Sequence, residues 1–363
     1  MYRYVQRDPD SSVYAAVSAV LDENEWIRCR RESPRFHLML GDLNRLPWHT
    51  LGQTGVKPLV NYYRGARLIC RKAQLTRTLN NYRSRMGRPP VPWYPESYVV
   101  SPRQNAKSTK RPPIIASTDD RDRLREAVTG RRDSVWIVKS SCGAKGLGML
   151  ITDSVEKAID FVDSQGQLHV VQKYIENPLL LDGDRKFDIR VWVLLDHEFR
   201  VFMYKEGVLR TTSEPYRPDD LQATTSHLTN HYLQENFSQN YGLYEEGNEM
   251  FFDEFAAFLH RKHGKRLHDV LSQIRSIVLE TFKSVREDLI LAETASYRSF
   301  QLFGFDFMLD TSFKVWLMEV NGSPASAERL LPAMAQSIVQ TAIDPLFPPA
   351  EEASQSTLFE PID

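Results

Sequence analysis

Two strand-like runs near the C-terminal end constrain the fold more than any other part of the sequence. Phe303–Met308 and Val315–Gly322 are largely apolar and are joined by a short polar connection. Two such runs predict an antiparallel hairpin. With a loop at Thr311–Lys314, Asp310 pairs with Val315, and this register sets the partner of each preceding residue. A β-sheet is therefore part of the fold, and the hairpin decides which side chains meet on it.

Polar side chains interrupt both runs at matching positions. The predicted register places Asp306 opposite Glu319, and strand alternation keeps Glu319 and Asn321 on one face. Carboxylates inside apolar strands are costly unless a positive charge compensates them. Oxygen ligands of this kind suit Mg²⁺ that bridges nucleotide phosphates, although a surface hairpin with chance acids has the same pattern. We therefore take these three residues as candidate metal ligands.

A second signal is a strand that leads a lysine into a glycine-rich loop. The run Val135–Lys139 is followed by the loop Gly143–Gly148 and then by another strand-like run. Glycine lets a backbone approach phosphates closely, so we expect the loop and Lys145 to cover a nucleotide whose phosphate meets Lys139. A P-loop is excluded, because Gly-Lys-Ser/Thr opening a helix is absent from this segment. Taken alone, the loop also fits a plain hairpin.

A third cluster alternates charged and apolar residues along one strand. Lys186, Asp188 and Arg190 share one face, and the apolar residues between them share the other. Such a row is often a salt-bridged sheet surface. Beside a nucleotide site it can instead bind phosphate and an acidic substrate.

The first third of the chain is strongly basic. Between Arg28 and Arg111 there are 18 Lys and Arg against three acids, a balance of +15, which leaves −16 for the rest of a chain whose net charge is −1. This asymmetry indicates an acidic partner, although a solvated basic face without a partner remains an alternative. After Gly65 a helical pattern is predicted to place Arg64, Arg67 and Arg71 on one face, where they can bind carboxylates.

The remaining patterns indicate a mixed α/β fold (α/β, α+β mixed) in three lobes. We expect a basic N-terminal lobe, a central lobe with the glycine-rich loop, a C-terminal lobe and a disordered tail, at residues 1–66, 67–185, 186–347 and 348–363. A polar, proline-punctuated connection is predicted at residues 100–118. Helices are predicted at residues 13–21, 249–261, 268–287 and 325–343.

Nothing in the sequence predicts a membrane segment. The start, Met1–Arg7, lacks the apolar run of a signal peptide, and no stretch reaches the ~20 apolar residues that span a bilayer. We expect a cytoplasmic protein that binds neither membrane nor nucleic acid. A monomer is expected because no long heptad pattern is present.

The order of these motifs resembles the tubulin-tyrosine ligase family of the ATP-grasp superfamily. The resemblance rests on the motifs above and on five further segments: Asn61–Gly65, Arg185–Arg190, His227–His231, Tyr244–Asn248 and Phe300–Asp306. It implies an ATP-grasp fold with ATP between the central and C-terminal lobes.

The resemblance also implies roles for individual residues. Nucleotide contacts fall on Lys72, Lys139, Gln172, Lys173, Ile175, Lys186, Asp188, Thr229 and Asn230. Asp306, Glu319 and Asn321 hold Mg²⁺, with two ions expected. The catalytic residues Arg190 and Arg210 face the acceptor carboxylate and the γ-phosphate, and Arg64, Arg67 and Arg71 guide an acidic tail.

The implied reaction is an ATP-dependent ligation on tubulin. The terminal carboxylate of detyrosinated α-tubulin, within the α/β-tubulin dimer, attacks ATP, and the amine of free L-tyrosine opens the resulting acyl phosphate. Two alternatives remain: a relative that adds glutamate or glycine with the same ATP machinery, and a non-catalytic tubulin-binding protein. Nucleic-acid binding through the basic lobe lacks a recognition motif.

Overall fold

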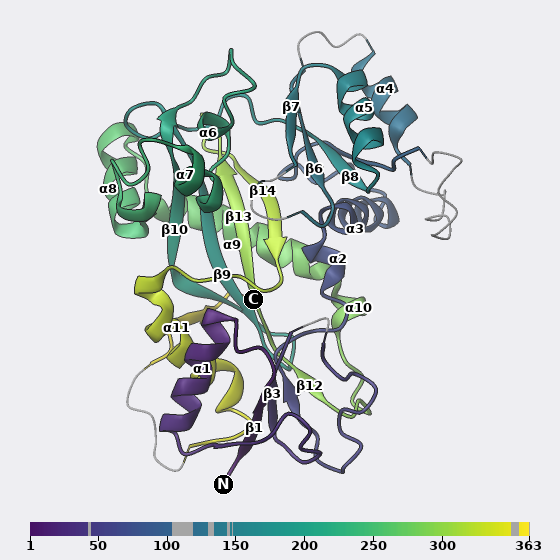
Figure 1. Cartoon of the computed structure of the whole chain (residues 1–363), viewed down its shortest axis with the longest axis vertical. Helices are drawn as coiled ribbons and strands as arrows, with labels where there is room; N and C mark the ends of the chain where they lie inside the picture. The colour runs from purple at the N-terminus through teal and green to yellow at the C-terminus, as the bar shows by residue number, and fades with distance from the viewer. Residues whose placement is uncertain are drawn as a thin grey trace.

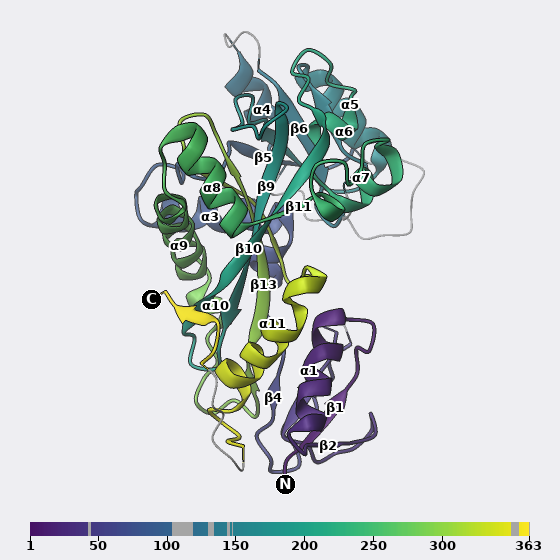
Figure 2. The ribbon, with the colours of Figure 1, turned by 90° about the vertical axis from the view of Figure 1, so that its left-hand side faces the viewer.

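Three β-sheets with helices packed on them make up the computed structural model of the chain. It describes residues 1–42, 45–103, 119–129, 134–143, 146, 148–349 and 356–362. Figures 1 and 2 show an N-terminal lobe at one end of the long axis, a central lobe at the other end and a long sheet that reaches between them. The mixed α/β class is confirmed.

The N-terminal sheet is parallel and has the strand order β12-β4-β3-β1-β2. Its strands are β1 (Arg3–Gln6), β2 (Ile27–Arg28), β3 (Leu38–Leu40), β4 (Leu59–Val60) and β12 (Arg298–Ser299). The last of these comes from the far end of the chain. The N-terminal lobe is therefore completed by a segment that follows the helices of the C-terminal lobe.

The central sheet is antiparallel and has the order β5-β8-β6-β7. Its strands are β5 (Ser97–Val100), β6 (Trp136–Ser140), β7 (Leu150–Thr152) and β8 (His169–Lys173), and its helices are α3 (Lys72–Arg85), α4 (Arg121–Val128) and α5 (Val155–Gln165). Apolar residues of α4 and α5 form one core with Trp136 and Val138 of β6. This packing leaves Lys139 on the opposite face, because side chains alternate along the strand.

The third sheet is antiparallel and has the order β11-β10-β9-β13-β14, with β15 paired to β10. Its strands are β9 (Arg185–Leu195), β10 (Val201–Pro215), β11 (Glu249–Phe251), β13 (Gln301–Leu309), β14 (Val315–Asn321) and β15 (Phe359–Pro361). The region between β10 and β11 carries the short helices α6 (Thr224–His227) and α7 (His231–Phe237) and the 3₁₀ turn Glu246–Asn248.

Helices cover both faces of this sheet. One face packs on α8 (Phe252–His263), α9 (Leu267–Lys283) and α10 (Arg286–Leu289). Part of the other face joins the core that α1 (Ser12–Glu23) forms with the 3₁₀ turn Glu328–Leu330, α11 (Leu331–Ile338) and the π-helical turn Val339–Ile343. Figures 1 and 2 both show α1 beside α11, so the two ends of the chain share one hydrophobic core.

The expected tail and the expected arginine face are both wrong where the structure describes the chain. The tail was expected to be disordered from residue 348, but Phe359–Pro361 forms β15 and Phe359 is buried against Tyr204. The predicted arginine face is interrupted, because α2 spans only Arg67–Cys70 and Arg71 has an extended backbone before α3 begins. An extended residue breaks the helical periodicity on which a common face for the three arginines depended.

Parts of two other predictions lie outside the described residues. Lys145 of the glycine-rich loop and most of the 100–118 connection are among them. Within the described ranges, no helix combines the length and the apolar character that crossing a membrane requires.

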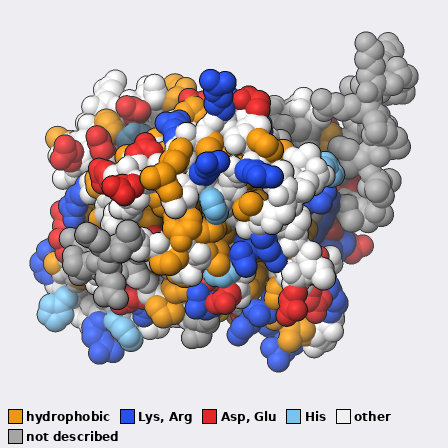
Figure 3. Space-filling model, turned by 90° about the horizontal axis from the view of Figure 1, so that it is seen from below, with side chains coloured by type: hydrophobic (Ala, Val, Ile, Leu, Met, Phe, Trp, Pro, Cys, Tyr) orange, Lys and Arg blue, Asp and Glu red, His pale blue; other side chains and the backbone are white. Residues whose placement is uncertain are grey.

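Figure 3 shows the face seen from below in Figure 1, the end at which the N-terminal lobe lies. Lys and Arg side chains surround a central apolar area, and Asp and Glu side chains lie among them. This face is therefore mixed in charge, so the basic character of the first third is not gathered into one uniform patch here.

Candidate active site

A row of opposite charges crosses four neighbouring strands of the third sheet. Arg210 of β10 is in register with Asp188 of β9, and Arg190 of β9 is in register with Asp306 of β13, which lies opposite Glu319 of β14. Arg190 forms a two-pronged ion pair with Asp306, and Arg210 contacts both Asp188 and Asp306, the latter at 2.8 Å. The predicted opposition of Asp306 and Glu319 is confirmed.

The other face of β9 explains why this row stays in place. Phe187, Ile189 and Val191 lie in the core that includes the apolar residues of α8 and α9. Burying these side chains sets the register of β9, because a slip of one residue would move them to the charged face. The predicted division of this strand into a charged and an apolar face is confirmed.

Asn321 links the two carboxylates of the hairpin. Its amide Nδ2 lies 3.3 Å from an oxygen of Asp306 and 3.3 Å from an oxygen of Glu319. Burial raises the pKa of Asp306 despite its two arginines, whereas Lys72 and Lys139 hold the pKa of Glu319 well below its usual range although burial opposes ionisation. The predicted metal-ligand set is thus assembled, and Glu319 is ionised at neutral pH.

Lys72 joins three segments at this point. The first residue of α3, it forms an ion pair with Glu319 at 2.7 Å and donates a hydrogen bond to the carbonyl of Gly143 at 3.3 Å. The helix, the loop after β6 and the end of β14 therefore meet at one ammonium group.

Lys139 and Gln172 face the same space from the central sheet. Lys139 Nζ donates to Gln172 Oε1 at 2.8 Å, and Gln172 Nε2 donates to Ser97 at 2.9 Å. Burial lowers the pKa of Lys139 to about 8, with Glu319 opposing this shift. Because Glu319 of the third sheet acts on the pKa of Lys139 in the central sheet, the two sheets share one electrostatic environment.

Lys186 lies in an aromatic cage that sequence reasoning did not assign. Its Nζ donates to Tyr174 Oη at 2.7 Å and lies 4.6 and 5.3 Å from the ring centroids of Tyr174 and Tyr216. The Tyr174 hydroxyl also contacts His227 Nδ1 at 2.8 Å. Burial lowers the pKa of Lys186 to about 7. Only the position of Tyr174, between the predicted nucleotide contacts Lys173 and Ile175, hinted at this cage.

The glycine-rich loop reaches the segment that carries Asn230. Gly146 has φ +74°, and a Cβ placed on it would lie 2.7 Å from Asn230 Oδ1 and 2.5 Å from Leu233 Cδ1. Glycine is therefore required at this position by both conformation and space. Thr229, also predicted to be near the phosphates, is partly exposed and precedes Asn230 at the start of α7.

Two predicted nucleotide residues do not join this cluster through their side chains. Lys173 lies one position beyond Gln172 on β8, so it points to the other face, where it forms an ion pair with Glu176 and lies over the Trp136 ring. Ile175 is buried just beyond the strand.

The three predicted tail-binding arginines are exposed near the start of α3. Arg71 directly precedes Lys72 and is therefore beside the charged row. Cys70 is packed against Gly322, where a Cβ would lie 2.9 Å from its sulfur, so α2 ends next to β14. Arg64 and Arg67 lie before and at the beginning of α2.

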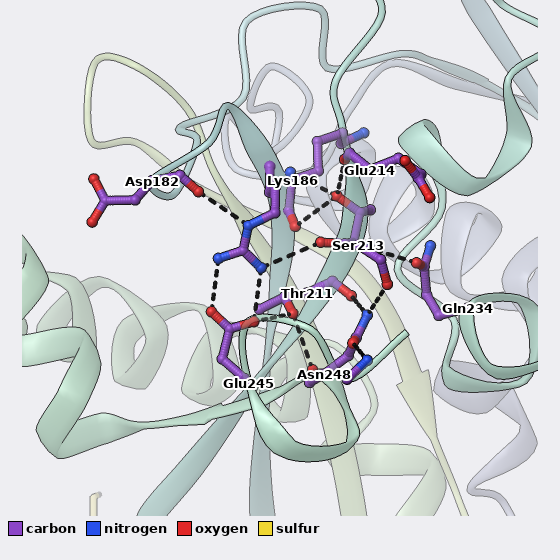
Figure 4. A network of polar contacts seen from close by, with 11 residues as sticks. Asp182, Lys186, Thr211, Ser213, Glu214, Gln234, Glu245 and Asn248 are labelled. Atoms are coloured by element: carbon purple, nitrogen blue, oxygen red, sulfur yellow. Dashed lines mark hydrogen bonds and ion pairs between the residues drawn. The ribbon is translucent and has the colours of Figure 1, made fainter. Parts of the chain in front are cut away.

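A buried ion pair supports the row from one side. Arg185, only 3% exposed, binds both carboxylate oxygens of Glu245 at 2.7 Å. Figure 4 shows Glu245 beside Thr211, which donates to it at 2.9 Å, and Asn248, whose amide donates to Ser213 at 2.7 Å. These contacts attach the segment after α7 to β9 and β10.

Comparison with known protein families assigns the chain to one of them. The sequence pattern of the tubulin-tyrosine ligase family matches residues 53–355. The chain belongs to the tubulin-tyrosine ligase family.

Several members of the tubulin-tyrosine ligase family are similar to this chain. Tubulin glycylase 3C of Tetrahymena thermophila is 31% identical over 60% of this chain, and tubulin polyglutamylase TTLL6 of Homo sapiens is 28% identical over 73%. A probable tubulin polyglutamylase, ttll-9, of Caenorhabditis elegans is 30% identical over 53%. The matches cover 21%, 28% and 46% of these relatives, so the chain spans less than half the length of each.

Proposed function

We propose that the protein is an ATP-dependent ligase that joins the amine of a free amino acid to a carboxylate of tubulin. The observation that carries this proposal is the excess of positive charge around the charged row. Five basic side chains, Lys72, Lys139, Lys186, Arg190 and Arg210, share the region with three acids, Asp188, Asp306 and Glu319. A buried excess of this sign favours a polyanionic ligand, and a nucleoside triphosphate has the required charge.

The residues of the hairpin fit a magnesium ion. The two carboxylates and the amide of Asn321 carry oxygen atoms of the type that Mg²⁺ binds. The Asn321 Nδ2 donates to both carboxylates, so it lies at the position between them to which a cation would be attracted. In the described part of the chain, no three His, Cys, Asp or Glu side chains are grouped as metal ligands, and the proposed set consists of two carboxylates and an amide. When bound, magnesium would neutralise phosphate charge.

The reaction requires an anionic carboxylate to approach an anionic phosphate. In the proposed reaction a carboxylate oxygen attacks the γ-phosphorus and ADP leaves; the amine then attacks the acyl carbon and inorganic phosphate leaves. Arg190 and Arg210 are suited to hold the acceptor carboxylate and the γ-phosphate, because hydrogen bonds to Asp188 and Asp306 fix their guanidinium groups beside each other. Fixed charges lower the repulsion without reorganising during the reaction.

We propose glycine or glutamate as the added amino acid. The sequence interpretation favoured tyrosine, but the similar proteins reported above are named as glycylases or polyglutamylases. The proposed partner remains the acidic tail of tubulin within the α/β dimer, met by exposed arginines such as Arg71 at the edge of the site. We also propose that the protein is cytoplasmic and monomeric.

A labelling experiment tests the function directly. The protein is mixed with Mg-ATP, tubulin and one labelled amino acid, in parallel reactions with glycine, glutamate and tyrosine, and covalent label on tubulin is measured. We expect glycine or glutamate to be incorporated, and the Glu319→Gln variant to incorporate neither. Tyrosine incorporation alone would restore the original interpretation. Nucleotide binding without incorporation of any of the three would favour a non-catalytic tubulin-binding protein.

A further inference from the structure

Tyr174 and His227 come from different lobes and meet at Lys186. Tyr174 follows β8 of the central sheet, whereas His227 ends α6 in the region between β10 and β11 of the third sheet. The Tyr174 hydroxyl lies 2.7 Å from Lys186 Nζ and 2.8 Å from His227 Nδ1. A single hydroxyl group therefore joins the central lobe to both a strand and a helix of the third sheet.

The directions of these hydrogen bonds follow from the chemistry of the partners. His227 Nε2 lies 2.9 Å from the carbonyl oxygen of Asp220, which can only accept, so Nε2 carries the proton. Burial lowers the pKa of His227, so the ring is neutral at neutral pH and Nδ1 accepts from Tyr174. Tyr174 then accepts from Lys186. The three hydrogen bonds therefore run in one direction, from Lys186 through Tyr174 and His227 to the backbone carbonyl of Asp220. We call this chain of hydrogen bonds the relay.

Packing around the relay holds the two lobes together. Tyr174 shares a small core with Ile137 of β6 and Ile151 of β7, and Tyr216 and Leu228 of the third-sheet region pack against it. The His227 ring meets the rings of Tyr174 and Tyr216 edge-on at centroid distances of 5.8 and 5.3 Å. Lys186 is thus enclosed by aromatic side chains from both the central lobe and the third-sheet region.

We propose that Tyr174 and His227 are positioning residues that hold the Lys186 ammonium in place for the phosphates of the bound nucleotide. Lys186 is held in this way only while the central lobe and the third-sheet region are in contact. This proposal rests on the proposed ATP-dependent function. Neither residue needs to touch the nucleotide, because both act through Lys186. A lysine chain has four rotatable bonds, so fixing its end removes conformational freedom that the nucleotide would otherwise have to remove on binding.

The matched variants are Tyr174→Phe and Tyr204→Phe. Both remove the hydroxyl of a buried tyrosine, but the Tyr204 hydroxyl has no hydrogen-bond partner among the described residues. Affinity for Mg-ATP is measured by calorimetry between pH 6 and 9. We expect Tyr174→Phe to weaken binding about tenfold, the effect of losing a hydrogen bond to a charged group, and Tyr204→Phe to leave it unchanged.

The pH profile separates positioning from a merely structural role. Without the hydroxyl as acceptor, the charged form of Lys186 loses a hydrogen bond, so affinity should begin to fall at a lower pH than in the wild type. Other charges facing Lys186 are Lys139 and Asp188, which remain. A purely structural defect would weaken binding equally at every pH.

Two variants of His227 give a second test of the proposal. Asn places an oxygen where Nδ1 stands, so His227→Asn should bind Mg-ATP close to wild type, whereas His227→Leu should match Tyr174→Phe. Hydrogen exchange of α6, measured without nucleotide, should rise in Tyr174→Phe and not in Tyr204→Phe. Equal affinity, pH profile and exchange in the two tyrosine variants would overturn the proposal.

Failure of the proposed function has a different signature. Wild-type protein that binds Mg-ATP but labels no tubulin leaves the comparison of the tyrosine variants intact. Wild-type protein that binds no Mg-ATP would overturn both the ATP-dependent function and the role of the relay in it, and hydrogen exchange would then decide the contact between the lobes by itself.

Discussion

Asp306 on β13 lies directly opposite Glu319 on β14, although the next pair along the hairpin is Phe307 with Leu317. Met318 is therefore the extra residue of a β-bulge, and from there to the turn the strands pair one position away from the predicted register: Leu309, rather than Asp310, faces Val315. The bulge brings the two carboxylates opposite each other at the end of the charged row.

Replacing Glu319 by Gln should strongly slow ligation while the fold is retained. The change removes the anionic partner that Lys72 contacts at 2.7 Å and one charge of the proposed magnesium site. We expect incorporation of label into tubulin to fall about 10²–10³-fold, the range for losing one preorganised charge contact, with the free energy of unfolding lowered by about 1–3 kcal/mol. Glu360→Gln, which alters long surface pairs with Lys205 and Arg275 at 3.5 Å, is the control and should change neither. Ligation at the wild-type rate would refute the metal assignment.

Nucleotide binding should take up protons at pH 8. The pKa of Lys139 is about 8 and that of Lys186 about 7, both lowered by burial, so each is partly or largely neutral in the free protein at this pH. Bound phosphate raises both pKa values, and affinity therefore falls as pH rises through this range. Calorimetry in two buffers of different ionisation enthalpy measures the uptake, which Lys186→Met should reduce. Binding heats that do not depend on the buffer would contradict the prediction.

The same two lysines predict how stability without nucleotide varies with pH. Their folded-state pKa values lie below the unfolded value of about 10.4, so the unfolded chain binds more protons between about pH 7 and 10. Their contribution to the free energy of unfolding therefore rises with pH in this window. Urea unfolding of the wild type and of the Lys139→Met, Lys186→Met double variant should show this slope only in the wild type. Parallel pH profiles of the wild type and the double variant would exclude this contribution of the two lysines.

Gly146→Ala should weaken nucleotide binding more than Gly148→Ala. Both glycines have positive φ, +74° and +65°, so alanine adds a similar backbone strain of about 1–2 kcal/mol at each. Only at Gly146 does the new Cβ meet other atoms, Leu233 at 2.5 Å and Asn230 at 2.7 Å. The difference between the two variants, measured as affinity for Mg-ATP, isolates the close approach of the loop to Asn230. Equal affinities would show that this approach is not needed.

Arg185→Met should destabilise the protein by about 3–5 kcal/mol, because it leaves the buried Glu245 carboxylate without its cationic partner. The double variant with Glu245→Leu should recover much of this loss, since no uncompensated charge remains. Chemical denaturation gives both values. Arg125→Met breaks the exposed pair with Glu156 and, as control, should cost less than about 1 kcal/mol. A loss of less than about 1 kcal/mol for Arg185→Met would show that the buried pair is not required for stability.

Local patterns in the sequence were sufficient to predict the strands and their faces. Period-two alternation placed Lys186, Asp188 and Arg190 together, and this prediction depends only on neighbours a few residues apart, whose relation the covalent geometry of a strand already determines. The pairing of Asp306 with Glu319 was predicted from the turn, but the structure reaches it through the bulge at Met318. The predicted arginine face is wrong because Arg71 has an extended backbone. One extended residue interrupts the helical periodicity from which the common face of the three arginines was predicted.

Contacts between distant segments could be decided only by the tertiary structure. Tyr174, Lys186 and His227 lie on three different elements, and their meeting depends on how the central sheet packs against the third sheet. The same is true of β15, whose Phe359 becomes buried only because β10 and Tyr204 provide a partner. The sequence determined which residues carry charge and which faces are apolar, because these are properties of the residues and their spacing. The structure decided which charges compensate one another, because that depends on burial and distance across the fold.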